Sequence, residues 1–179
     1  MDVSRKSLAL ILTLAIIAVG TWVSCFWWPR NAHPITTVYV SRHAEKLNSS
    51  DNPPLSETGK VRAAELAHVL KNESIDAVFV TQFLRTQQTG EPTALQRNLK
   101  MVEYKAGSPE DVANTILTDH LGDQVLVIGH SNTVDNIAAS LGVSGVPELI
   151  GAQYDRLFVV TRFGAKTHLN LLRYGSETP

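Results

Sequence analysis

Short apolar runs alternate with longer amphipathic stretches along the chain after residue 34. The short runs predict four strands, at 35–41, 75–80, 99–104 and 124–128, and the first of them is rich in β-branched residues. The stretch after each run predicts a helix, at 56–71, 82–96, 109–120 and 131–141. Two further runs, 155–162 and 168–173, flank the sequence Phe163-Gly164-Ala165-Lys166 and predict a hairpin.

This alternation predicts an α/β fold, a three-layer sandwich of a mostly parallel sheet with helices on both faces. The C-terminal hairpin is expected to add antiparallel strands at one edge. The run at 124–128 is continuously apolar, which predicts a central strand. Pro92 predicts a kink or an early end of the helix that contains it.

The N-terminal segment reads as a membrane anchor. Residues 7–28 carry no charge and are long enough to cross about 30 Å of hydrocarbon as a helix. Aromatic residues gather at its far end, and Arg5 and Lys6 precede it, which favours an N-terminus on the cytoplasmic side. We therefore expect a cytoplasmic N-terminus at 1–6, a transmembrane anchor at 7–28, a linker at 29–34 and an extracytoplasmic domain at 35–175.

Two other fates of the N-terminal segment remain open. Val23-Ser24-Cys25 resembles a bacterial lipoprotein cleavage box with Cys25 as the lipidated residue, although Trp22 stands where such boxes usually carry leucine. Ordinary signal-peptide cleavage, followed by secretion, requires small residues at the cleavage site, whereas bulky aromatic residues lie here. All three fates put the domain outside the cytoplasm, on the periplasmic or extracellular side.

Composition excludes several classes of function. Sixteen basic and seventeen acidic residues give a net charge of −1 without a basic stripe, so nucleic acid is not an expected partner. A single cysteine excludes an intramolecular disulfide framework and a cysteine-based zinc cluster. No carboxylate cluster or His-x-x-x-His spacing indicates a metal site, so we expect neither a metal nor another cofactor.

The candidate catalytic residues lie near the ends of three predicted strands. Arg42 and His43 follow the first strand, Arg85 lies just after the second, and His130 follows the strand at 124–128. Ligands in such sheets bind beyond the carboxyl ends of the strands. A neutral imidazole can attack phosphorus, and guanidinium groups can bind the oxygens of the transferred phosphoryl group. The N-terminus of the helix after His130 is expected to point amide groups at the same anion.

Four segments resemble motifs of the histidine phosphatase superfamily, which includes cofactor-dependent phosphoglycerate mutases. They occur in family order, at 42–46, at 55–63, at 81–89 and at 127–132. The resemblance implies that His43 is the phosphorylated nucleophile and that Arg42, Arg85 and His130 complete the phosphate pocket. The absence of a large inserted segment is typical of the short phosphohistidine-phosphatase type.

The general acid of the family is the part that the sequence does not identify. Such an acid, a Glu or Asp that follows the second-strand motif, protonates the leaving oxygen. Glu103 and Glu110 are the candidates we name, with Asp111 and Asp135 as further carboxylates in reach. None of them lies in a sequence context that matches the family.

The resulting hypothesis is a membrane-anchored, extracytoplasmic phosphatase that works through a phosphohistidine intermediate. Its substrate is expected to be a phosphorylated small molecule or a phosphoprotein. A weak general acid suffices when the leaving group departs easily. The expected substrate is therefore a phosphoramidate, an anhydride or an acidic phosphoester and not a simple alkyl phosphate. The alternatives are a non-catalytic phosphate-binding envelope module and a phosphoglycerate-type mutase.

Overall fold

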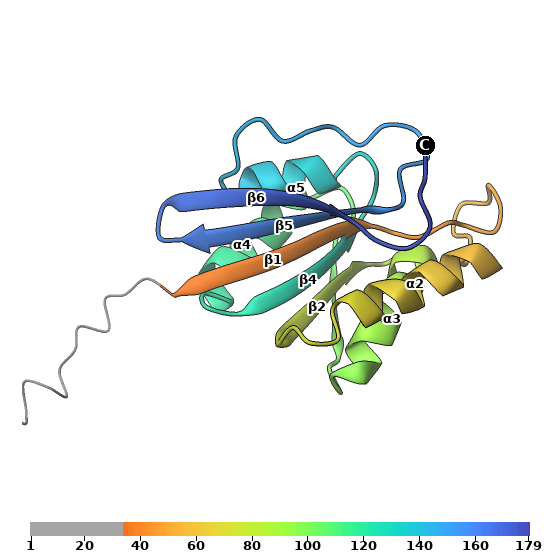
Figure 1. Ribbon diagram of the computed structural model, residues 1–179, viewed down its shortest axis with the longest axis horizontal. Helices are drawn as coiled ribbons and strands as arrows, with labels where there is room; N and C mark the ends of the chain where they lie inside the picture. The colour runs from red at the N-terminus through yellow and green to blue at the C-terminus, as the bar shows by residue number, and fades with distance from the viewer. Residues whose placement is uncertain (1–33) are drawn as a thin grey trace, which may run out of the picture. The chain divides into compact units, whose positions relative to one another are not determined.

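One mixed sheet forms the centre of the computed structural model, which describes residues 34–179 (Figure 1). Within that part of the chain its order is β3-β2-β4-β1-β5-β6. The strands are β1 (Ile35–Arg42), β2 (Ile75–Thr81), β3 (Met101–Tyr104), β4 (Gln124–Gly129), β5 (Arg156–Phe163) and β6 (Lys166–Arg173). The pairs β3–β2, β2–β4 and β4–β1 are parallel, whereas β5 and β6 join β1 as an antiparallel hairpin. The mostly parallel sheet, its terminal hairpin and the central position of β4 are therefore confirmed.

Four described helices cover the parallel strands in two pairs (Figure 1). They are α2 (Glu57–Val69), α3 (Leu84–Gln96), α4 (Pro109–Asp119) and α5 (Val134–Ser140). Helix α2 packs against α3, and α4 packs against α5. The strand-to-helix alternation of the sequence thus becomes a layer of helices on each face of the sheet.

Alternate residues of β4 separate two hydrophobic cores. Val125 and Val127 pack in one core with Ile116 of α4 and Ile137 of α5. Leu126 and Ile128 point the other way and pack in the second core with Leu66 of α2 and with Leu70, which follows that helix. A central strand has no solvent-facing side, which explains its unbroken apolar sequence.

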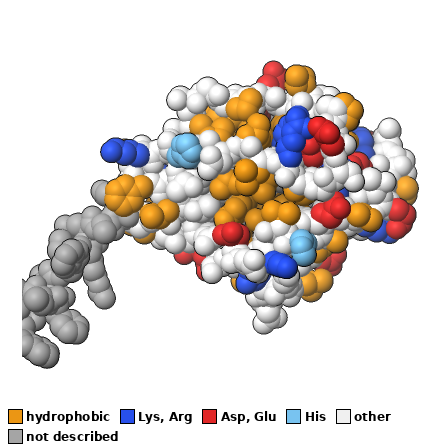
Figure 2. All heavy atoms as spheres, in the orientation of Figure 1, with side chains coloured by type: hydrophobic (Ala, Val, Ile, Leu, Met, Phe, Trp, Pro, Cys, Tyr) orange, Lys and Arg blue, Asp and Glu red, His pale blue; other side chains and the backbone are white. Residues whose placement is uncertain are grey.

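The antiparallel part of the sheet is covered less completely. Strand β6 lies at the edge, and its Leu171 and Leu172 are 44% and 48% exposed. Hydrophobic side chains gather over β5 and β1 at the centre of the face shown in Figure 2. The helical layers therefore cover mainly the strands β1 to β4.

Helix α3 continues through Pro92 to Gln96, so the predicted end at residue 96 is confirmed and the early end at the proline does not occur. Thr93 and Ala94, which follow the proline, are 1% and 3% exposed, and this burial outweighs the local cost of proline. Helix α5 begins at Val134 and not at residue 131, because a turn occupies residues 131–133.

The expected membrane anchor at 7–28 lies outside the described residues, as do the expected cytoplasmic segment 1–6 and the linker up to residue 33. Within residues 34–179, no helix combines the length and the apolar character that a bilayer span requires.

Candidate active site

The carboxyl ends of the parallel strands surround a pocket of about 400 Å³. Parallel pairing places Arg42 of β1 opposite Gly129 of β4, so the residues that follow both strands meet at one edge. The pocket is lined by Arg42, His43, Lys46, Phe83, Arg85, Ala106, Gly107, His130, Ser131 and Asn132. The structure thus brings together all four residues that the sequence predicts for the phosphate pocket.

Backbone contacts hold His43 in one orientation. Its Nδ1 lies 2.7 Å from the carbonyl oxygen of Ala44, and its backbone N–H donates to the carbonyl of Gly129 at 2.9 Å. A carbonyl can only accept, so Nδ1 carries the proton and Nε2 keeps its lone pair. Burial, reinforced by the charges of Arg42 and Arg85, lowers the pKa of His43 to about 3. The imidazole is therefore neutral at physiological pH, as a nucleophile must be.

His130 faces His43 across the pocket. The two ring centroids are 5.4 Å apart and the planes are inclined by 65°. Nε2 of His130 lies 3.1 Å from Oγ1 of Thr81, and the ring of Phe83 packs edge-on at 5.5 Å. Burial, followed by the charges of Arg85 and Arg42, lowers the pKa of His130 to about 4. A bound phosphate dianion favours the protonated form of His130 and so opposes this lowering of its pKa. His130 is therefore suited to take up a proton when phosphate binds.

Each guanidinium of the pocket lies over an aromatic ring. The Arg85 guanidinium is 4.2 Å from the centroid of Phe83, and that of Arg42 is 4.1 Å from the centroid of Tyr154. Arg42 Nη1 also donates to the carbonyl of Gly151 at 2.8 Å. These rings fix flat cations without neutralising them, and so leave their charge available to an anion.

A buried ion pair supports the segment that carries His43. Arg62 of α2 donates from Nη2 to Glu45 Oε1 at 2.8 Å, and from Nε to both carboxylate oxygens of Glu45. Its Nη1 donates to the carbonyls of Tyr174 and Ser176 beyond β6. The pair therefore ties the segment after β1 to α2 and to the residues that follow the last strand. The motif residues Glu45 and Arg62 thus have a structural role beneath the pocket.

The second-strand motif also supports the first. The backbone N–H of Ala44 donates to Thr89 Oγ1 at 3.0 Å, and that hydroxyl donates to the carbonyl of Arg85 at 2.7 Å. One threonine of α3 thereby links the chain next to His43 to the turn that presents Arg85. Sequence reasoning quoted this motif without assigning Thr89 a part.

The expected helix-terminal anion site is not present in the predicted form. The backbone N–H groups of Thr133 and Val134 both donate to the carbonyl of His130, at 3.0 and 3.1 Å. These amides are therefore already occupied within the turn. Ser131 and Asn132 line the pocket in place of a helix terminus.

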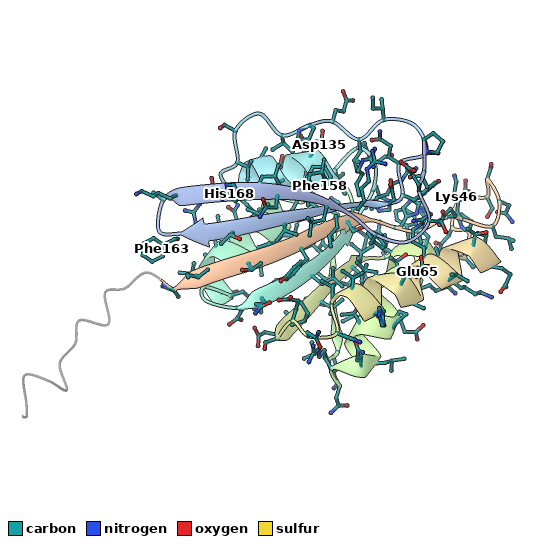
Figure 3. All side chains as sticks on the ribbon, viewed as in Figure 1. Lys46, Glu65, Asp135, Phe158, Phe163 and His168 are labelled. Carbon is teal, nitrogen blue, oxygen red and sulfur yellow. The ribbon has the colours of Figure 1, made fainter. Side chains whose placement is uncertain are left out.

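The structure does not bring the candidate acids to the pocket. Glu103 lies exposed on the edge strand β3, and Glu110 and Asp111 are exposed in the first turn of α4. Asp135 lies on α5, apart from Lys46 at the pocket (Figure 3). Among residues 34–179, no carboxylate belongs to the pocket lining. The acid role of Glu103 or Glu110 stays a prediction.

Three residues of the site were missed by sequence reasoning. Lys46 belongs to the first motif, but no function was predicted for it. Its position three residues after His43 could have placed it near the pocket that it lines. Phe83 was quoted only as part of a motif. Tyr154 has no local signal at all, because only the folded chain brings residue 154 to Arg42. Within the described part of the chain, no group of His, Cys, Asp and Glu could hold a metal ion.

Comparisons with known proteins agree with this geometry. Residues 38–106 match the family model of the histidine phosphatase superfamily (branch 1). No curated protein matches the chain. The structure of the protein histidine phosphatase SixA complexed with tungstate is similar at 24% identity and a TM-score of 0.61, over 76% of this chain and 96% of that one.

Two further solved structures share the fold. Bacillus stearothermophilus YhfR is 15% identical with a TM-score of 0.62, over 75% of this chain and 95% of its own. A mycobacterial glucosyl-3-phosphoglycerate phosphatase is 12% identical with a TM-score of 0.62, over 79% of this chain and 100% of its own. The similarity in fold extends over nearly the whole of each of these solved chains.

Proposed function

We propose that the chain is a member of the histidine phosphatase superfamily that hydrolyses a phosphorylated substrate through a phosphohistidine on His43. One observation carries this proposal. The neutral Nε2 of His43 lines a pocket together with Arg42, Arg85 and His130, and Nδ1 is held by Ala44. A fixed lone pair beside permanent cations is suited to attack a phosphoryl group.

In the first step, the lone pair of His43 Nε2 forms a bond to phosphorus. The bond from phosphorus to the leaving atom breaks, and its electron pair goes with the leaving group. Arg42 and Arg85 bind the equatorial oxygens, on which charge is spread in the transition state. His130 donates to the same group once it is protonated.

In the second step, a water oxygen attacks phosphorus and the N–P bond breaks. Its electron pair returns to Nε2, and both protons of the water leave with dihydrogen phosphate. The Nδ1–H bond to Ala44 persists through both steps, so the ring needs no reorientation between them.

The substrate class follows from the absence of a carboxylate in the described pocket lining. Without a strong general acid, hydrolysis favours groups that leave readily. We therefore propose a phosphoramidate, an anhydride or an acidic phosphoester, on a small molecule or a protein. Comparable rates on a simple alkyl phosphate and on an aryl phosphate are the result that contradicts this.

The location is proposed from the sequence of residues 7–28. An uncharged segment of that length, with aromatic residues at its end and basic residues before it, favours an anchor with the domain outside the cytoplasm. Partition of the full chain into membranes, and its susceptibility to protease from the outside, test this. A shortened chain in the soluble fraction is the outcome that indicates cleavage and secretion.

Labelling with a phosphodonor tests the chemistry. The full chain is incubated with labelled acetyl phosphate, quenched in alkali and mapped by mass spectrometry. We expect an acid-labile phosphoryl group on His43 and none in His43→Ala. His168→Gln is the matched control, because His168 lies exposed on β6 and its side chain forms a hydrogen bond with Asn170. Absence of both label and turnover in the parent favours the non-catalytic phosphate-binding module.

A further inference from the structure

We propose that the pocket binds a second negative charge, carried by the leaving group of the substrate, and that Lys46 is the residue that binds it. This rests on the proposed phosphatase function and narrows its substrate to phosphorylated anions, such as diphosphates, in which the second charge lies close to the scissile bond.

Burial divides the pocket into a floor and a mouth. Arg42, His43 and His130 form the floor and are 9%, 5% and 8% exposed. Lys46, Gly107 and Asn132 are exposed and form the mouth. A ligand bound at the floor is therefore expected to extend toward these exposed residues, Lys46 among them.

The orientation of the reaction places the leaving group at the mouth. The phosphoryl group reaches Nε2 of His43 at the floor, and in-line displacement puts the leaving atom on the side opposite the attacking nitrogen. We infer that this side faces the mouth of the pocket, to which the exposed Lys46 belongs, at the start of the segment from β1 to α2 (Figure 3).

The backbone of Lys46 is held in this place. Lys46 pairs with Leu55 in an isolated antiparallel bridge, and the N–H of Leu47 donates to the carbonyl of Pro54 at 2.9 Å. These contacts close the base of the loop that follows the first motif. The lysine therefore has a fixed origin at the mouth, while its side chain is free to reach a ligand.

The charges of the pocket leave one cation without a counterpart. Arg42, Arg85 and Lys46 are positive, both histidines are neutral, and no described carboxylate lines the pocket. Lys46 is in none of the ion pairs found in residues 34–179. A bound phosphoryl dianion balances the charges of Arg42 and Arg85, and protonation of His130 on binding adds a further positive charge. The charge of Lys46 at the mouth is therefore left without a counterpart.

A cation in this position assists a leaving group without transferring a proton. When the P–O bond breaks, its electron pair stays on the leaving oxygen, which departs as an anion next to the ammonium and is protonated later by solvent. Lys46 stabilises this charge electrostatically. The proposal thereby explains how the reaction proceeds with no carboxylic acid in the pocket lining.

Binding of phosphonates tests the proposal independently of turnover, because their P–C bonds are not hydrolysed. Dissociation constants of methylphosphonate and methylenediphosphonate are measured by calorimetry with the full chain. We expect the diphosphonate to bind about fivefold more tightly, equivalent to ~1 kcal/mol. Lys46→Gln should remove this preference and Lys46→Arg should keep it. Lys105→Gln is the matched control, because Lys105 adjoins the lining residue Ala106 without lining the pocket.

Three results overturn the proposal. The first is equal affinity of the parent for both phosphonates. The second is a preference for the diphosphonate that survives Lys46→Gln. The third is a preference that falls equally in Lys105→Gln, which would assign it to the general electrostatic field of the protein. Failure of the labelling experiment on His43 contradicts the phosphatase function, whereas failure of this experiment contradicts only the role of Lys46.

Discussion

Nε2 of His130 lies 3.1 Å from Oγ1 of Thr81, at the end of a chain of hydroxyl groups. Oγ1 of Thr81 lies 2.9 Å from Oγ1 of Thr86, which donates to the carbonyl of Phe83 at 2.8 Å. Because the Thr86 proton is engaged, Thr86 accepts from Thr81, and Thr81 in turn accepts from the N–H of His130. The chain thus places the proton of neutral His130 on Nε2 and leaves Nδ1 to take up the second proton when phosphate binds.

Thr81→Val should therefore lower kcat/KM by about tenfold, since a buried hydrogen bond to an ionisable group is worth ~1.5 kcal/mol. The ¹⁵N shifts of His130 should show loss of the Nε2–H tautomer preference. Thr81→Ser should restore both. Thr93→Val is the control, because Thr93 is 1% exposed and its hydroxyl has no hydrogen-bond partner. An unchanged tautomer of His130 in Thr81→Val contradicts the proposed series of hydrogen bonds from His130 through Thr81 to Thr86.

Acid should destabilise the empty protein through its two pocket histidines. Their folded-state pKa values, about 3 for His43 and about 4 for His130, lie below the unfolded value near 6.5. The unfolded chain therefore binds more protons as the pH falls below about 6.5. Each histidine should then cost up to ~1.4 kcal/mol of unfolding free energy per pH unit, until the folded pKa is approached.

Urea unfolding at pH 7.5 and pH 5.5 measures this effect. We expect a loss of about 2–3 kcal/mol between these pH values for the parent. His43→Gln should show roughly half of it, because one of the two titrating groups is gone. Saturating phosphate should reduce the loss, since it favours protonated His130. An equal loss of unfolding free energy in the parent and in His43→Gln contradicts the lowered pKa of His43.

The ion pair between Arg62 and Glu45 should contribute strongly to stability. Arg62→Met leaves Glu45 without its partner and two backbone carbonyls without a donor, which should lower the free energy of unfolding by about 3 kcal/mol. Lys60→Met on the same helix loses only the exposed pair with Glu57 and should cost less than about 0.5 kcal/mol. Similar losses for the two variants would show that burial of the Arg62 pair does not matter.

Gly59 should tolerate no side chain. A Cβ at this position would lie 2.2 Å from the carbonyl oxygen of Glu45, so Gly59→Ala must displace either α2 or the segment that carries His43. We expect a loss of stability of about 2–3 kcal/mol and a lower kcat/KM. Gly107→Ala meets nothing within 4 Å and is the stability control. A melting temperature of Gly59→Ala equal to that of Gly107→Ala contradicts this packing.

The sequence by itself determined the order of the strands and helices and four residues of the pocket. Strands such as 124–128 are apolar on both faces, and the polar residues after them, such as His130, must lie at the carboxyl edge of a parallel sheet. These conclusions depend on local pattern and on the geometry of parallel strands. They require no knowledge of which side chains meet.

Only the tertiary structure decided which groups surround those residues. Tyr154 contacts Arg42, and Ser176 contacts Arg62, across more than a hundred residues of chain. Helix α5 begins at Val134, after a turn in which the amides of Thr133 and Val134 donate to the carbonyl of His130. Glu103 lies on the edge strand β3, away from the pocket lining. Such contacts arise from long-range packing, which local propensity and spacing do not encode.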